Sequence, residues 1–300
     1  MPQYNNFSEA EIIQNYKRIN NPTCNLDIYL KHWKYEELLQ NEITSNFKDT
    51  RNIADSYKKF LHSINKEKVT DNMKNSFIYL INSRNKYSVS KGYSNYVELI
   101  LNEFNIPEQD YNLFNKRFSK EIPRTHKEKC LICTMNNFPF GSFDEVISFV
   151  LNADLIKKVI IKNGDYSDVK YLKESDQFEI TINNSLKFKH QCLHLLHELC
   201  HINFFIECFD KKILFIKLGK YKNELEALKK EAKLLVSISD DLYKFKKNDS
   251  LNIAKNTFME SQLYLNPKTS ILSKEYFYDK QYYLRPLNRM AHSVAYSNLF

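Results

Sequence analysis

The spacing of apolar and polar positions predicts helices over the first third of the chain. Four segments carry apolar or aromatic residues at helical intervals, with Lys and Glu between them: 9–19, 27–64, 71–91 and 94–104. The first begins with a capping-box pattern, Ser8-Glu-Ala-Glu11. Gly92 supplies a C-terminal cap to the third helix, and Ser94 is the expected N-cap of the fourth.

The pattern changes in the middle third. Short runs of β-prone residues, bounded by Asn, Gly, Asp and Ser, predict strands at 130–134, 159–162, 169–172 and 178–183. After these runs the sequence is helical again to its end. We therefore expect a mainly α protein with a small mixed β-sheet (α+β), arranged as a helical region 1–125 followed by a region 126–300 that contains the sheet.

The apolar run 193–205 follows the last strand and contains the sequence His197-Glu198-Leu199-Cys200-His201. This is the HExxH pattern of zinc peptidases. On a helix, residues four apart share a face, so His197 and His201 can each offer an imidazole nitrogen to one metal ion. Glu198 lies about 100° further round, where it can act on a water molecule without ligating the metal. The pattern predicts a site for one zinc ion.

A buried helix that carries two histidines by chance is the alternative interpretation. The flanking residues are apolar, so two imidazoles and a carboxylate would be buried there without a partner, which is energetically unfavourable. Neither Pro nor Gly interrupts the segment, and a suitable third ligand follows. These three features favour the zinc site.

The third ligand is predicted in a second helix around 223–231. Glu224 lies 23 positions after His201 (224 − 201), which leaves room for a connection and a returning helix. Glu231 lies seven positions further on the same face and is placed to accept the outer N–H of a ligand histidine. We interpret Glu226 as a solvated acid paired with Lys230 at i+4.

Composition bounds the setting of this site. The 300 residues carry a formal net charge of +8, mostly from Lys spread along the chain, without an Arg-rich arm or a zinc-finger spacing. Because the positive charge is not concentrated in such a module, we expect no specific nucleic-acid partner. We also expect no membrane partner, because no apolar run reaches the length of a membrane span. The polar N-terminus and six Cys, interpreted as free thiols, favour the cytoplasm. Cys130-Leu-Ile-Cys133 is interpreted as part of a buried strand.

Three separated segments together resemble one family, the thimet oligopeptidase and oligoendopeptidase F peptidases of the gluzincin group. The first is His197–His201, where the family usually has Gly at the position of Cys200. The second is Glu224–Glu231, which is similar to the helix that carries the family's ligand Glu. The third, Tyr278–Tyr283, is similar to the family's Tyr-Asp-Ala-x-Tyr-Tyr sequence, and we call it the tyrosine segment. Arg84–Tyr96 is similar to a helix-Gly-Tyr stretch upstream of the family's catalytic centre.

The resemblance implies a gluzincin-type zincin fold and a hydroxyl donor to the oxyanion. The family has a further Tyr two positions after Tyr283, and this chain has Arg285 there. Tyr278, Tyr282, Tyr283 and Arg285 are therefore all candidate donors. Aromatic packing is the alternative role for these tyrosines. The chain is about half the family's usual length, which implies a more open cleft.

The resulting hypothesis is a zinc endopeptidase or oligopeptidase acting on a peptide or protein substrate. His197, His201 and Glu224 hold zinc, and Glu198 is the general base. Two alternatives stay open: a dedicated processing or regulatory protease for one protein or peptide, and a non-catalytic binding module on a gluzincin scaffold.

Overall fold

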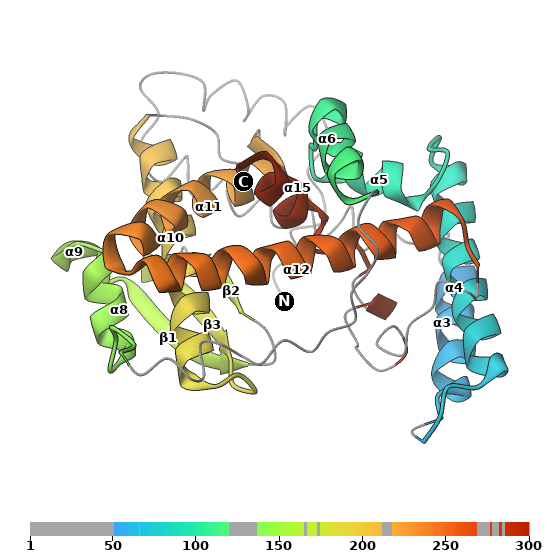
Figure 1. Ribbon diagram of the computed structural model, residues 1–300, viewed down its shortest axis with the longest axis horizontal. Helices are drawn as coiled ribbons and strands as arrows, with labels where there is room; N and C mark the ends of the chain where they lie inside the picture. Colours follow the sequence, from blue (N-terminus) through green and yellow to red (C-terminus); the bar gives the residue numbers. More distant parts are fainter. Residues whose placement is uncertain are drawn as a thin grey trace. The chain divides into compact units, whose positions relative to one another are not determined.

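Figure 1 shows the protein as a computed structural model. It describes residues 51–65, 67–119, 137–164, 167–172, 175–211, 218–268, 277, 282–283 and 286–299. Along these residues the elements follow in the order α3 (Arg51–Ser63), α4 (Asp71–Ser90), α5 (Tyr96–Glu103), α6 (Glu108–Phe118), α8 (Phe143–Val150), α9 (Ala153–Ile156), β1 (Val159–Gly164), β2 (Asp168–Leu172), β3 (Gln177–Asn183), α10 (Phe188–Asp210), α11 (Gly219–Ile238), α12 (Asp240–Leu265) and α15 (Met290–Leu299). The expected mainly helical fold with a small sheet is confirmed.

The chain divides into two compact units, each made of several segments. Unit 1 comprises Met1–Ser45, Lys129–Leu218 and Glu226–Ile238. Unit 2 comprises Asn46–Glu128, Gly219–Leu225 and Ser239–Phe300. Helix α11 contributes its first residues to unit 2 and the rest to unit 1. The single division expected between residues 125 and 126 stays a prediction.

Unit 1 contains a three-stranded mixed sheet in the order β1-β3-β2. Strand β3 is central, parallel to β1 and antiparallel to β2. Its residues alternate in burial, with Phe178, Ile180 and Ile182 on the buried face. These strands confirm the predictions at 159–162, 169–172 and 178–183, whereas the predicted strand 130–134 lies outside the described residues.

Helix α10 covers the buried face of this sheet (Figure 1). The ring of Phe205 packs against Tyr171 of β2 and Phe178 of β3, with centroid distances of 5.7 and 5.5 Å. Helix α8 packs along α10, where Asn203 donates a hydrogen bond to the carbonyl of Val150 (3.2 Å). The HExxH sequence is thus part of a well-packed helix.

Unit 2 is helical in its described part. Helices α3 and α4 pack together, and the 26-residue helix α12 contacts α4, α5, α6 and α15. Phe114 and Phe118 of α6 pack against Phe258 of α12, with centroids 6.0 and 6.3 Å from it. Buried aromatic rings therefore hold the long helix to its neighbours.

Most helix boundaries follow from local capping. Helix α4 ends before Gly92, which has φ +90° as its predicted capping role requires. The N-cap predicted at Ser94 is wrong by one residue, because Asn95 accepts the N–H of Glu98 (3.1 Å). Helix α3 lies within the range 27–64, where one or two long helices are predicted. Residues 27–50 of that range and the predicted helix 9–19 lie outside the described residues.

The start of α11 is fixed by backbone geometry. Gly219 has φ +68°, and a Cβ at this position would lie 2.6 Å from the Asn105 side chain. The N–H of Tyr221 donates to the carbonyl of Phe104 (3.0 Å), and Lys220 Nζ donates to Asn288 Oδ1 (2.8 Å). These contacts set the rotation of α11 within unit 2, and with it the direction in which Glu224 points.

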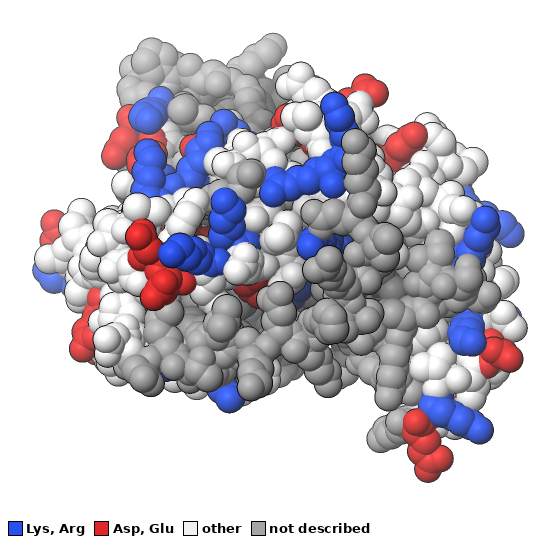
Figure 2. All heavy atoms as spheres, in the orientation of Figure 1, with Lys and Arg blue, Asp and Glu red and all other residues white. Residues whose placement is uncertain are grey.

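Two surface properties bear on the predicted partners. No helix in the described ranges combines the length and the apolar character needed to cross a membrane. On the face shown in Figure 2, Lys and Arg side chains lie at several separate places, with Asp and Glu close to many of them. This face carries mixed charge, and the absence of a nucleic-acid partner stays a prediction.

Candidate metal centre

Helix α10 places the two histidines of the HExxH sequence side by side. Nε2 of His197 lies 3.1 Å from Nε2 of His201, and the two rings are nearly perpendicular, with an interplanar angle of 89°. In unit 1 His201 is buried and the side chain of His197 is 12% exposed. The two nitrogens lie within hydrogen-bond distance of each other on one face of the helix, as the i, i+4 spacing predicts.

Glu231 lies against the outer nitrogen of His197. Its Oε2 is 3.0 Å from His197 Nδ1, and its side chain is 1% exposed. An ionised carboxylate only accepts hydrogen bonds, so Nδ1 carries the proton and donates it. In the neutral ring Nε2 is then unprotonated and directs its lone pair toward His201.

This donor set fits a zinc ion. Two nitrogens bound to zinc at 2.0–2.1 Å with a tetrahedral angle are about 3.3 Å apart, close to the observed 3.1 Å. The carboxylate behind His197 is the partner that ligand histidines usually have. Binding of one metal ion by both Nε2 atoms requires the proton of each neutral ring to lie on Nδ1, in His201 as in His197.

Glu198 is buried beside this pair, with 8% of its surface exposed. The neighbouring Leu195, Leu196, Leu199 and Cys200 are fully buried, so the polar groups of the site lie in an apolar environment. A carboxylate in such surroundings is a suitable general base, because its charge is poorly solvated by water.

Glu224, the predicted third ligand, belongs to unit 2. Its Oε2 lies 3.3 Å from Nδ1 of His292 on α15, and both side chains are largely buried. Sequence reasoning missed His292, which lies 68 positions after Glu224 in a helix without any metal-binding spacing. Only the packing of α15 in unit 2 reveals this pair.

The solvated acid Glu226 has a different partner from the one expected. It pairs with Lys229 at i+3 (2.9 Å), whereas Lys230 pairs with Glu207 of α10. The expected Glu226–Lys230 pair is therefore wrong. Lys230 instead contributes to the packing of α11 on α10, because its side chain is turned toward that helix.

The tyrosine segment is described at two of its positions. Tyr282 and Tyr283 are both buried, and the Tyr283 ring packs against Phe60 at 5.3 Å and Tyr57 at 6.2 Å. Tyr278 and Arg285 lie outside the described residues. The role of each candidate oxyanion donor stays a prediction.

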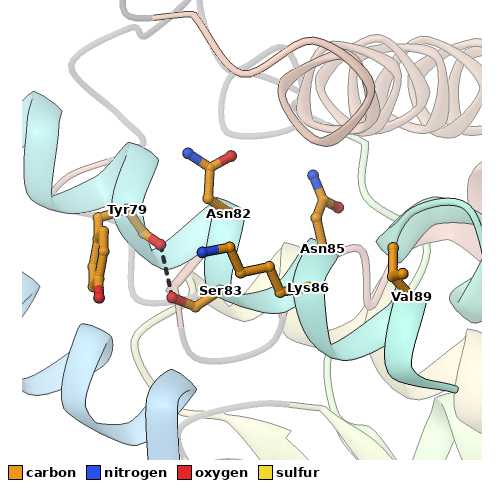
Figure 3. A pocket seen from close by; sticks show the side chains of 6 residues that line it. All are labelled: Tyr79, Asn82, Ser83, Asn85, Lys86 and Val89. Atoms are coloured by element: carbon orange, nitrogen blue, oxygen red, sulfur yellow. Dashed lines mark hydrogen bonds between the residues drawn. The ribbon is translucent and has the colours of Figure 1, made fainter.

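A pocket of about 400 Å³ lies elsewhere, on α4 of unit 2 (Figure 3). It is lined by Tyr79, Asn82, Ser83, Asn85, Lys86 and Val89. Ser83 Oγ donates to the carbonyl of Tyr79 (2.9 Å), and the lining contains neither a carboxylate nor a histidine. The described lining of the pocket therefore offers no carboxylate or imidazole ligand for a metal ion.

Comparison of the chain with protein-family models, curated proteins and solved structures gives no match. The resemblance described above thus rests on the quoted residues alone.

Proposed function

We propose that this protein is a zinc-dependent endopeptidase or oligopeptidase with a gluzincin-type zincin fold. The observation that carries the proposal is the group His197, His201 and Glu231, with its Nε2–Nε2 distance of 3.1 Å and its Nδ1–carboxylate distance of 3.0 Å. The order of a small sheet, an HExxH helix and a second helix with spaced Glu residues supports the same fold.

His197, His201 and Glu224 would hold the zinc ion. Helix α11 runs without interruption from Gly219 to Ile238, so Glu224 and Glu231 lie two turns apart on one face. Glu231 contacts His197, so in the unit 1 part of α11 this face is turned toward the HExxH helix. We assign Glu224 as the third ligand on this basis. When bound, zinc supplies Lewis acidity toward water and toward the scissile carbonyl.

The residues of the chain perform the proton transfers. Glu198 takes a proton on its carboxylate as water attacks the scissile carbonyl, and then delivers that proton to the leaving amine. Glu231 holds His197 in the tautomer that directs Nε2 inward. A hydroxyl of the tyrosine segment, or Arg285, donates to the oxyanion.

A peptide is the substrate class that the fold suits. Among the described strands, β1 and β2 lie at the two edges of the sheet, and an extended peptide can add to such an edge through backbone hydrogen bonds. This supports a peptide or protein substrate.

The test compares wild type with Glu198→Gln for zinc content and for cleavage of a random peptide library. Glu198→Gln keeps the shape of the side chain and removes its basicity. We expect unchanged zinc content and a fall in kcat of roughly 100- to 10,000-fold. Wild-type rates in the zinc-loaded variant would contradict the mechanism, and the lack of zinc in wild type would contradict the metal site. A wild type that cuts only a few library members would identify a dedicated processing protease.

A further inference from the structure

Arg84 is a buried cation in unit 2, far along the chain from the residues it contacts. It lies on α4 and is 5% exposed. Its Nη1 donates to the Tyr264 hydroxyl (2.7 Å), and its Nη2 donates to the carbonyl of Tyr283 (2.5 Å). A guanidinium is costly to bury unless its N–H groups find acceptors. One of the acceptors here is the backbone of the tyrosine segment.

Glu260 on α12 contacts the chain four residues later. It is 3% exposed, and its Oε1 accepts the N–H of Leu287 (2.9 Å). Leu287 has φ +55°, a left-handed conformation that a residue other than Gly adopts only where its surroundings impose it. The carboxylate of Glu260 is one of the groups that impose it.

Further contacts hold the surroundings of Arg84 in place. The Asn85 amide donates to the carbonyl of Tyr264 (2.8 Å) and accepts the N–H of Tyr96 (3.0 Å). Asn85 is the residue next to Arg84 and is labelled in Figure 3. Burial raises the pKa of Tyr264 to about 12, although Arg84 acts in the opposite direction. The Tyr264 phenol is therefore neutral and its oxygen can accept from Arg84.

Ring packing secures the same stretch of chain. Tyr283 packs on Phe60, and Phe277 packs on Phe60 and Phe77 with centroids 6.4 and 5.7 Å away. The chain is therefore held at Phe277 by rings, at Tyr283 by rings and Arg84, and at Leu287 by Glu260. Two buried charges from two helices act on backbone atoms of one short segment.

We propose that Arg84 and Glu260 are positioning residues that fix the backbone at Tyr283 and Leu287 and thereby the placement of Tyr282 and Tyr283, two of the candidate oxyanion donors. This inference rests on the proposed peptidase function. An oxyanion donor must lie within a fraction of an ångström of its place to act. The inference also explains why two regions that resemble the family, Arg84–Tyr96 and the tyrosine segment, meet at a buried hydrogen bond.

The first measurement needs neither metal nor activity. Hydrogen exchange of the Leu287 amide is followed by NMR in metal-free wild type and in Arg84→Leu. We expect exchange at least about tenfold faster in the variant, with unchanged protection in α10, because the segment then opens locally. Tyr111→Phe, a buried tyrosine on α6 of the same unit, is the matched control and should exchange like wild type.

The second measurement is steady-state kinetics of the zinc-loaded variants. Displacement of the oxyanion donor in these variants should lower kcat by about 100-fold. It should leave KM within about threefold of wild type. Glu260→Leu should show this loss. Glu260→Gln, which keeps an oxygen for the Leu287 N–H, should recover most of it. Binding of a phosphinic peptide, which mimics the tetrahedral oxyanion, should weaken in parallel with kcat.

Three outcomes would overturn the inference. Unchanged exchange at Leu287 would show that Arg84 does not fix the segment. Faster exchange in α10 as well would show general destabilisation instead of local positioning. Faster exchange with normal kcat would show that the held segment carries no donor. An inactive wild type would instead overturn the proposed peptidase, and the exchange measurement would still decide whether Arg84 and Glu260 fix the segment.

Discussion

Glu231 accepts a hydrogen bond from Nδ1 of His197 over 3.0 Å, although the two residues lie 34 positions apart on different helices. This contact fixes which nitrogen of His197 is protonated. It also joins the second half of α11 to the HExxH helix. Removal of the Glu231 carboxylate is consequently the most direct test of whether this pair supports zinc binding.

Glu231→Ala is expected to weaken zinc binding by roughly 10- to 100-fold, because His197 loses the partner that sets its tautomer and ring orientation. The zinc dissociation constant is measured by competition with a chromophoric chelator. Glu207→Gln is the matched control, since it removes a carboxylate between α10 and α11 that pairs with Lys230 and not with His197. Equal affinities for wild type and Glu231→Ala would refute the tautomer argument.

Glu224→Gln is expected to weaken zinc binding more than the Glu231 change does, by at least about 100-fold, because a ligand oxygen loses its charge. Glu226→Gln, two residues along the same helix, is the control, because Glu226 pairs with Lys229. The same competition assay applies. If Glu224→Gln and Glu226→Gln lose zinc affinity equally, Glu224 is not the third ligand.

Phe205→Ala is expected to lower the free energy of unfolding by about 3–5 kcal/mol, because it removes the ring that joins α10 to β2 and β3. Urea denaturation followed by circular dichroism measures the change. Phe188→Ala on the same helix removes a ring that is 41% exposed and stacks on Phe143, and should cost only about 1 kcal/mol. A similar cost for both would argue against the sheet–helix core.

The cysteines of α10 are expected to resist alkylation in the folded protein. Cys192, Cys200 and Cys208 are buried free thiols, and burial raises the pKa of Cys192 to about 12 and that of Cys208 to about 11. At pH 8 both pKa values lie well above the pH, so the reactive thiolate is a minor species. Mass spectrometry after iodoacetamide treatment should show modification of these cysteines only in urea. Rapid labelling of Cys192 without urea would contradict the burial of α10.

Periodicity predicted the elements of the described chain where the pattern was long or strictly alternating. The run around His197 and the alternation of Phe178, Ile180 and Ile182 are such cases. Burial against the core requires apolar residues at the repeat of the helix or of the strand, so the sequence itself shows that repeat. Helix α6 was not predicted, although Pro107 marks its start. Helix α8 was not predicted either, although Ser142 and Glu145 form a capping pair at its first turn.

The contacts of the candidate site were predictable to different degrees. Spacing alone places His197 and His201 together, since both belong to one helix. The Glu224–His292 pair depends on how α15 packs in unit 2, and no local pattern encodes that packing. The same holds for the contact of Arg84 with Tyr283, which joins residues 199 positions apart.

The continuity of α11 has a consequence for how this protein can change over generations. Adding one residue between Glu224 and Glu231 would turn one of them by about 100° relative to the other. The start of the helix is also fixed, by the left-handed Gly219 against Asn105. If Glu224 and Glu231 serve one metal site as proposed, lineages that keep the site should accumulate replacements along this helix while its length between the two glutamates stays constant.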